Sequence, residues 1–164
     1  MKYIFVLFAL FALFFIRKPK RINKNNNFIV SPCDGTVMNV DNNIISVFLS
    51  PLVVHWQYIP IDGIVKNIEY IEGTNYLAMK PESYHNTGVK ITIITEIGEI
   101  DIIQKVGFFV RRIINNLKIG DKVKQSEPYG LILFGSRVDI ILPEYIKSNL
   151  KKDQKVIAGV TSLI

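Results

Sequence analysis

The sequence predicts a mainly β fold: a compact β-sandwich or barrel-like domain with few short helices, preceded by an N-terminal hydrophobic helix. Three observations support this prediction. The chain has 164 residues, which suits one domain with a hydrophobic core. Beyond the N-terminus its apolar residues are mostly isoleucine and valine, which favour strands. Gly, Pro, Asn and Asp divide these apolar runs into short segments, as the turns between strands require.

Five β-branched runs are expected to contain the strands. They are residues 37–49, 64–71, 89–95, 99–106 and 131–142. Residues 96–99 (EIGE) have the composition of a hairpin turn between two of them. Within the domain, we expect short helices only at residues 108–117 and 144–150.

A short sequence pattern occurs twice, as PCDGTV at residues 32–37 and PIDGIV at residues 60–65. Each copy places a Pro-x-Asp-Gly turn ahead of a valine-bearing strand. Asp-Gly is strong turn chemistry wherever it occurs, so two copies do not make a repeat protein. They do fit a compact β fold with related halves. Residues 118–124 (KIGDKVK) also resemble a turn that recurs in lipoyl-like barrel sandwiches.

Residues 3–16 form an uninterrupted apolar run. As a helix this run spans about 21 Å, which is less than the ~30 Å hydrocarbon core of a bilayer. The length also suits a signal peptide, but no small-residue cleavage site follows and the basic residues lie on the wrong flank. We therefore expect residues 1–21 to be an uncleaved membrane anchor with a basic flank. A polar linker at residues 22–27 then leads to one domain at residues 28–164.

The net charge of +6 is concentrated beside the anchor and near the C-terminus. The basic residues next to the anchor are Arg17, Lys18, Lys20, Arg21 and Lys24. Such residues are attracted to anionic lipid, and the positive-inside rule would place the main domain on the cytoplasmic side. Aromatic residues do not alternate with the basic ones, which argues against nucleic-acid binding. A single cysteine excludes an internal disulfide.

The most informative motif is Gly135-Ser136, which lies in residues 134–139 (FGSRVD) between two apolar runs. A serine after glycine can attack its own peptide carbonyl, because Gly135 has no side chain to block the approach. An N-to-O acyl shift followed by elimination of the ester would leave a pyruvoyl group on a new amino terminus. The chain would thus make its own cofactor and divide into residues 1–135 and 136–164.

Several motifs, in their order along the chain, resemble the phosphatidylserine decarboxylase proenzymes, particularly the short form. They are residues 31–37 (SPCDGTV), 48–55 (FLSPLVVH), 59–65 (IPIDGIV), 110–113 (VRRI), 134–139 (FGSRVD) and 142–143 (LP). The resemblance implies conversion of phosphatidylserine to phosphatidylethanolamine and CO₂ through a Schiff base to the pyruvoyl group. It also implies that the two self-cleaved chains stay associated at an anionic membrane, and it is compatible with a homo-oligomer.

The resemblance also implies roles for individual residues. Ser136 would be the nucleophile and, after cleavage, would carry the pyruvoyl group. His55 matches the active-site histidine of the family and would move protons, and Asp34 matches an aspartate that partners the base during self-cleavage. Asn86 and Arg137 are expected at the substrate, where a guanidinium can bind phosphate or carboxylate in a forked geometry.

Some of these roles have alternatives. Arg137 can instead form a structural ion pair with Asp139, and Arg111 and Arg112 are further candidates for anion binding. A thiol nucleophile at Cys33 with His55 as its base is another alternative. No metal site is expected, because two histidines and one cysteine, widely scattered, make a poor zinc ligand set.

The chain departs from the family near the expected lipid head-group site. After His55 it reads WQY, where short members typically carry a small apolar residue, Asn and Arg, and long-form members have a second histidine at the position of Tyr58. Asn86-Thr87-Gly88 replaces Asn-Glu-Arg. The alternative function is therefore a non-catalytic or substrate-shifted homologue that acts as a membrane-tethered, β-rich binding module.

Overall fold

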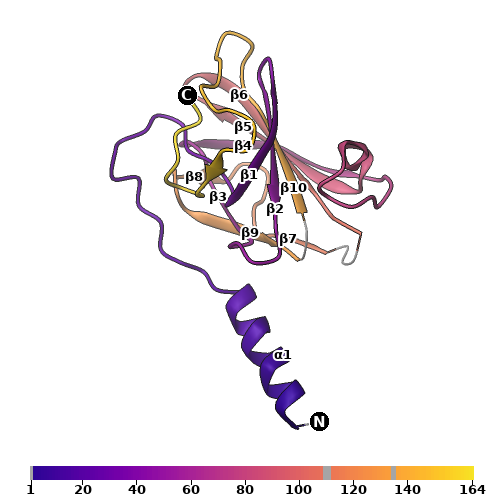
Figure 1. Ribbon diagram of the computed structural model, residues 1–164. Helices are drawn as coiled ribbons and strands as arrows, with labels where there is room; N and C mark the ends of the chain where they lie inside the picture. The colour runs from indigo at the N-terminus through magenta and orange to yellow at the C-terminus, as the bar shows by residue number, and fades with distance from the viewer. Residues whose placement is uncertain (1, 109–111, 134–135) are drawn as a thin grey trace.

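The computed structural model describes residues 2–108, 112–133 and 136–164, and the fold is mainly β, as predicted (Figure 1). Within these residues, eight strands form a curled sheet in the order β11-β1-β2-β10-β6-β5-β4-β8, and three form a second sheet in the order β3-β9-β7. Every pair of neighbouring strands in the two sheets is antiparallel.

The strands of the large sheet are β1 Gly35–Asp41, β2 Ile44–Leu49, β4 Gly63–Ile71, β5 Gly88–Thr95, β6 Gly98–Lys105, β8 Lys122–Val123, β10 Ser136–Ile141 and β11 Lys155–Val156. Those of the small sheet are β3 Trp56–Tyr58, β7 Ile113–Asn115 and β9 Pro128–Ile132. The helical segments are α1 Lys2–Phe15 and the 3₁₀ turn η1 Pro81–His85. One core receives buried apolar side chains from both sheets.

Most of the expected strands are present. The runs at residues 64–71, 89–95 and 99–106 form β4, β5 and β6, and Thr95 pairs with Gly98 across the expected turn. Gly98 has φ +101°, which an L side chain rarely adopts. The run at residues 37–49 is a hairpin of two strands, and the run at residues 131–142 contributes to two different sheets.

Both helices expected inside the domain are wrong. The described part of residues 108–117 contains strand β7, because pairing with β9 satisfies its backbone and overrides local helix propensity. Residues 144–150 form a turn followed by irregular chain. In that segment Tyr145 bonds to the carbonyl of Ile97 and Ser148 to that of Leu163, so its contacts are with other parts of the domain.

The two Pro-x-Asp-Gly segments begin equivalent strands, which confirms the expected related halves. Gly35 opens β1 opposite Val156, and Gly63 opens β4 opposite Val123. A Cβ on either glycine would lie 2.4 Å from a backbone oxygen of the neighbouring strand, so the close approach requires glycine at both places. β1 and β4 also carry a register shift at corresponding positions, after the valine two residues further on.

The connections between the halves are reciprocal as well. The amide of Val30 donates to Pro60 O at 2.9 Å, and the amide of Tyr58 donates to Pro32 O at 2.8 Å. Since 30 and 58, like 32 and 60, occupy matching positions in the two copies, these bonds relate the halves by an approximate two-fold rotation.

Helix α1 projects away from the domain and forms the N-terminal extension that the apolar run predicted (Figure 1). Most of its large apolar side chains are exposed, but Phe15 at its end is 2% exposed. No helix among the described residues combines the length and apolar character that crossing a bilayer requires.

Candidate functional site

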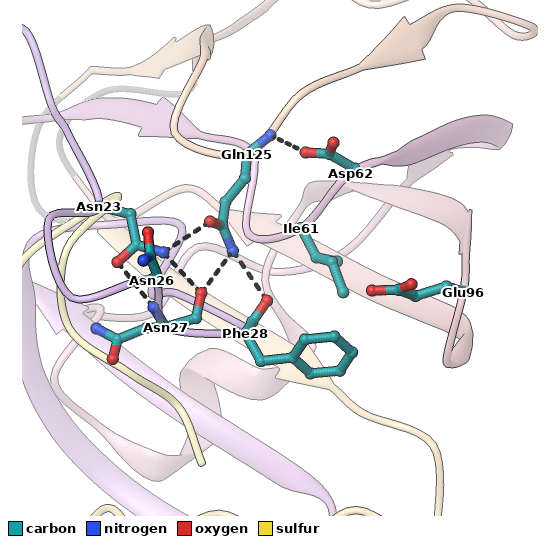
Figure 2. Close-up of a pocket in the computed structure, with 8 residues that line it drawn as sticks. All are labelled: Asn23, Asn26, Asn27, Phe28, Ile61, Asp62, Glu96 and Gln125. Carbon is teal, nitrogen blue, oxygen red and sulfur yellow. Dashed lines mark hydrogen bonds between the residues drawn. The ribbon is translucent and has the colours of Figure 1, made fainter.

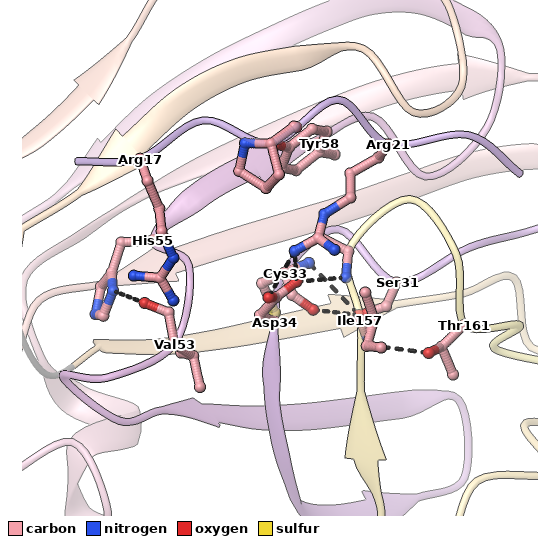
Figure 3. Close-up of polar contacts among 12 residues, drawn as sticks. Arg17, Arg21, Ser31, Cys33, Asp34, Val53, His55, Tyr58, Ile157 and Thr161 are labelled. Carbon is pink, nitrogen blue, oxygen red and sulfur yellow. Dashed lines mark hydrogen bonds and ion pairs between the residues drawn. The ribbon is translucent and has the colours of Figure 1, made fainter. Parts of the chain in front are cut away.

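His55 lies between β2 and β3, and its side chain is fully buried. Its Nδ1 lies 2.9 Å from the carbonyl oxygen of Val53 (Figure 3). A carbonyl oxygen only accepts hydrogen bonds, so Nδ1 carries the proton and Nε2 keeps its lone pair. In the described part of the chain, Nε2 is buried and has no hydrogen-bond partner. The imidazole is therefore held in the tautomer that can accept a proton at Nε2.

The pKa of His55 is lowered to about 4, mainly by burial; the bond to Val53 opposes this shift, and the nearby charge of Arg17 adds to it. The imidazole is therefore neutral at pH 7. Phe15 covers it, with the two ring centroids 4.2 Å apart and the ring planes tilted by 33°.

Ser136 is the first residue of β10 and is fully buried, opposite Leu49 at the end of β2. The preceding strand, β9, ends at Ile132, whose amide donates to His55 O at 3.3 Å. Four residues of chain span at most about 15 Å, which is the upper limit on the distance between Ile132 and Ser136. The other half of the expected scissile bond, Gly135, lies outside the described residues, as do Phe134 and Arg111.

Asp34 precedes β1 in its Asp-Gly turn. Its carboxylate accepts two hydrogen bonds from Arg21, at 2.7 and 3.0 Å, and one from the amide of Ala158 at 2.8 Å (Figure 3). The backbone amide of Val54, the residue before His55, also acts on this carboxylate and lowers its pKa. Burial raises the pKa of Asp34, and these bonds oppose the rise.

The carboxylate of Asp34 thus lies close to the backbone of Val54, the residue before His55. No recorded contact among the described residues joins it to the imidazole, whose Nδ1 instead faces Val53. The direct pairing of Asp34 with the base therefore stays a prediction.

The second Asp-Gly turn supplies an internal comparison. Asp62 lies in a pocket lined by Asn23, Asn26, Asn27, Phe28, Ile61, Glu96 and Gln125 (Figure 2). Its carboxylate accepts the backbone amide of Gln125 at 2.7 Å, as Asp34 accepts that of Ala158. Among the described residues, Asp34 forms an ion pair and Asp62 forms none. Both aspartates therefore accept a hydrogen bond from a backbone amide, and Asp34 in addition contacts an arginine.

Asn86 is 1% exposed, and its side chain bonds to the chain's own backbone. Oδ1 accepts the amide of Tyr76 at 2.7 Å, and Nδ2 donates to the carbonyls of Tyr76 and Val106, both at 2.8 Å. These bonds hold the segment before η1 against the end of β6. The substrate contact expected of Asn86 stays a prediction.

Arg137 forms the structural ion pair that was its alternative. Its Nε lies 2.7 Å from Asp139, which also pairs with Lys105 at 3.1 Å. The guanidinium donates further to Ser46 and Ser83, and all three charged side chains are at most 10% exposed. This cluster ties β10 to β6 and to η1. The Arg137 guanidinium also donates to the carbonyl of Pro81, so a substrate contact would compete with four internal partners.

Cys33 is buried beside Asp34. Burial, reinforced by the negative charge of Asp34, raises the pKa of its thiol. A thiol that resists ionisation is a poor nucleophile, which disfavours the Cys33 alternative.

Sequence analysis missed two residues of this site. Arg21 was assigned to the basic flank of the anchor, and Phe15 to the anchor itself. The guanidinium of Arg21 also lies over the ring of Tyr58, with Cζ 6.0 Å from the ring centroid. Tyr58 occupies the position at which short members of the family typically carry arginine. Neither Arg21 nor Phe15 has a spacing relative to Asp34 or His55 that would reveal the contact.

Comparisons with known proteins agree with the motifs. The family model for phosphatidylserine decarboxylase matches residues 39–163. A phosphatidylserine decarboxylase proenzyme of Thermobifida fusca is 42% identical over 154 residues, which cover 91% of this chain and 70% of that protein. Proenzymes of the same name from Streptomyces coelicolor and Chlorobaculum tepidum are 38% and 35% identical, over 92% and 95% of this chain and 71% and 78% of their own lengths.

Proposed function

Because the chain belongs to the phosphatidylserine decarboxylase family, as its motifs indicated, we propose that it cleaves itself between Gly135 and Ser136 and then decarboxylates phosphatidylserine. The products would be phosphatidylethanolamine and CO₂. The observation that carries this proposal is the His55 imidazole, which is neutral, buried and held with its Nε2 lone pair available. A buried nitrogen without a hydrogen-bond partner among the described residues costs folding free energy, so a catalytic use explains its presence.

Self-cleavage begins when His55 Nε2 takes the proton of the Ser136 hydroxyl. The oxygen then bonds to the Gly135 carbonyl carbon while the peptide C–N bond breaks and its nitrogen takes the proton back from His55, which gives an ester and a free amine on Ser136. Removal of the Ser136 α-proton then releases Gly135 as a carboxylate and leaves a dehydroalanine, which tautomerises to an imine. Water replaces the imine nitrogen, ammonia leaves, and the ketone of the pyruvoyl group remains. Asp34 would assist from its position close to the Val54 backbone, which precedes His55 in the chain.

The site can accommodate the resulting pyruvoyl group, because its carrier Ser136 is buried and His55 offers an unpaired polar atom. When present, the pyruvoyl carbonyl would bind the substrate amine and withdraw electrons from the carbon that loses CO₂. His55 would then return a proton to that carbon, the role of a general acid. Ser136 would orient the group, since it pairs with Leu49 of β2 and the strand that it begins is paired on both sides from Arg137 onward.

We also propose that α1 attaches the protein to an anionic membrane, which holds the substrate. Its exposed apolar side chains would enter the interface, and Lys18 and Lys20 would face the head groups. The apolar helix matches the hydrocarbon side of a lipid surface, and the cations that follow it match the anionic head groups, as a peripheral anchor requires.

The proposal is tested by the mass of the purified, denatured protein. We expect two chains, residues 1–135 and 136–164, with the smaller one blocked by a pyruvoyl group. Ser136→Ala should give one intact chain with no decarboxylase activity on phosphatidylserine vesicles. A wild-type protein that remains intact, or an intact and fully active Ser136→Ala protein, would overturn the proposal and favour the tethered binding module.

The two-fold arrangement supplies a matched control for Asp34. Asp34→Asn should slow self-cleavage strongly, whereas Asp62→Asn removes the equivalent carboxylate from the other half and should leave the cleavage rate unchanged. Equal rates in the two variants would remove Asp34 from the mechanism.

A further inference from the structure

The segment that follows α1 lies along β3 and is bonded to it. Trp56 Nε1 donates to the carbonyl of Ile16 at 3.0 Å, and the Tyr58 hydroxyl donates to that of Pro19 at 2.6 Å. These bonds fix the backbone at both ends of a stretch of four residues. Sequence analysis treated this stretch as the basic flank of a tether, but its position is set by the domain.

Phe15 is directed toward the domain while its neighbours are not. Its side chain is 2% exposed, whereas Phe14 and Ile16 are 45% and 48% exposed. The ring lies against the imidazole of His55, with 4.2 Å between centroids. Phe15 therefore contributes to the burial of His55, the largest cause of its lowered pKa.

Arg17 connects the same segment to the loop ahead of His55. Its guanidinium donates to the carbonyl of Leu52 at 2.9 Å and to that of Phe14, and it stacks on the Phe14 ring at 3.7 Å. The imidazole is thus contacted by Phe15 on one side and by the Val53 carbonyl of this loop at Nδ1.

Arg21 carries the contact with Asp34. One guanidinium nitrogen lies within 3.0 Å of both carboxylate oxygens, and the two side chains are only 17% and 14% exposed. Hydrogen bonds between charged groups that are largely shielded from water are among the stronger polar contacts in proteins. The remaining titratable groups that face Asp34 are Tyr58 and Cys33, which carry no charge at pH 7.

We propose that residues 15–21 are part of the reaction centre, in which Arg21 is a positioning residue for the Asp34 carboxylate and Phe15 is a positioning residue for the His55 imidazole. This inference rests on the proposed self-cleavage and adds two residues to it. It also means that the segment leading to the membrane helix completes the site, so the helix and the site are not independent parts.

The test is the rate of self-cleavage against pH for freshly synthesised full-length chain, followed by denatured mass. Arg21→Ala should slow cleavage at pH 7 by about tenfold to a hundredfold, the range that one hydrogen bond to a charged group supports. Because the Arg21 charge lowers the pKa of Asp34, its loss should also move the acid limb of the profile to higher pH. Lys90→Ala, which breaks the ion pair with Asp101 elsewhere on the sheet, should change neither.

Arg21→Lys separates charge from geometry. It should keep the acid limb of the wild type and recover part of the rate, since a cation is retained but the rigid guanidinium that places the nitrogen between both carboxylate oxygens is lost. Phe15→Ala should expose His55 and raise its pKa from about 4 toward 6.5, which an NMR titration of the imidazole measures. Both variants remain informative where Arg21→Ala fails to fold.

The outcomes distinguish the two proposals. A wild-type chain that never cleaves would overturn the proposed function and this inference with it. A wild type that cleaves, with an Arg21→Ala profile identical to it, would overturn the inference alone. Two results together would reduce these residues to a structural role. In the first, both Arg21 variants cleave slowly but keep the acid limb of the wild-type pH profile. In the second, Phe15→Ala leaves the His55 titration unchanged.

Discussion

The His55 ring is held by a carbonyl two residues earlier in the chain, so its tautomer is decided by local backbone geometry. Its neutrality is decided by burial, which is a property of the whole fold. Both conditions are needed for a base that works near pH 7, because a protonated imidazole has no lone pair to offer.

The depressed pKa of His55 makes folding stability depend on pH. The unfolded chain binds a proton at this site below pH 6.5, and the folded chain binds it only near pH 4. Stability is therefore complete above pH 6.5 and is lost as the pH falls, by about 3 kcal/mol at pH 4. We expect urea unfolding to show this loss in the wild type and not in His55→Gln, once their common acid dependence is subtracted. Parallel curves for the two proteins would show that the imidazole is solvated.

At the scale of elements, one buried carboxylate joins three segments. Asp139 on β10 pairs with Lys105 on β6 and with Arg137, whose guanidinium reaches Ser83 in η1. Burial lowers the pKa of Lys105, and Asp139 opposes that shift. The cluster lies at the start of β10, so it also fixes the strand that begins at Ser136.

Removing this carboxylate should be costly. Asp139→Asn leaves two buried cations without their counter-charge, and we expect the free energy of unfolding to fall by about 3–5 kcal/mol. Glu99→Gln is the control, because it breaks an ion pair with Lys66 that is half exposed, and it should cost less than about 1 kcal/mol. Chemical denaturation measures both. Similar costs for the two variants would mean that the cluster is open to water.

The strands follow from local patterning better than the helices do. β4, β5 and β6 are short β-branched runs bounded by turn residues, and the expected boundaries are correct within about two residues. β7 is different, since its three residues become a strand only because β9 lies beside them. Local propensity has no access to such a partner, so the helix expected there was wrong.

At the scale of the whole molecule, the apolar helix and the proposed reaction centre meet at Phe15. α1 lies next to the end of the domain that carries β7 and β9 (Figure 1). An attached membrane would therefore lie next to the end of the domain that carries His55. This arrangement suits a substrate whose head group must reach the site while its acyl chains stay in lipid.

Membrane attachment through α1 can be tested by co-sedimentation with vesicles. We expect the full-length protein to bind anionic vesicles better than neutral ones, and added salt to weaken the difference. Leu7→Gln combined with Leu10→Gln removes two exposed apolar side chains from α1 and should lower the bound fraction at least about tenfold. Tyr70→Gln, at an equally exposed apolar residue on β4, should have no effect. Equal binding by all three proteins would remove α1 from the interface.

The sequence by itself determined the family, the mainly β class, the apolar helix and the identity of Ser136, His55 and Asp34 as the residues to examine. These are encoded in short motifs and in the alternation of apolar and turn residues, which act over a few positions. Only the tertiary structure decided that Arg21 is the partner of Asp34 and that Phe15 covers His55. Those contacts span 13 and 40 positions of chain, and they exist because the segment after α1 folds back along β3. Long-range packing of this kind depends on the complete core, so no local pattern records it.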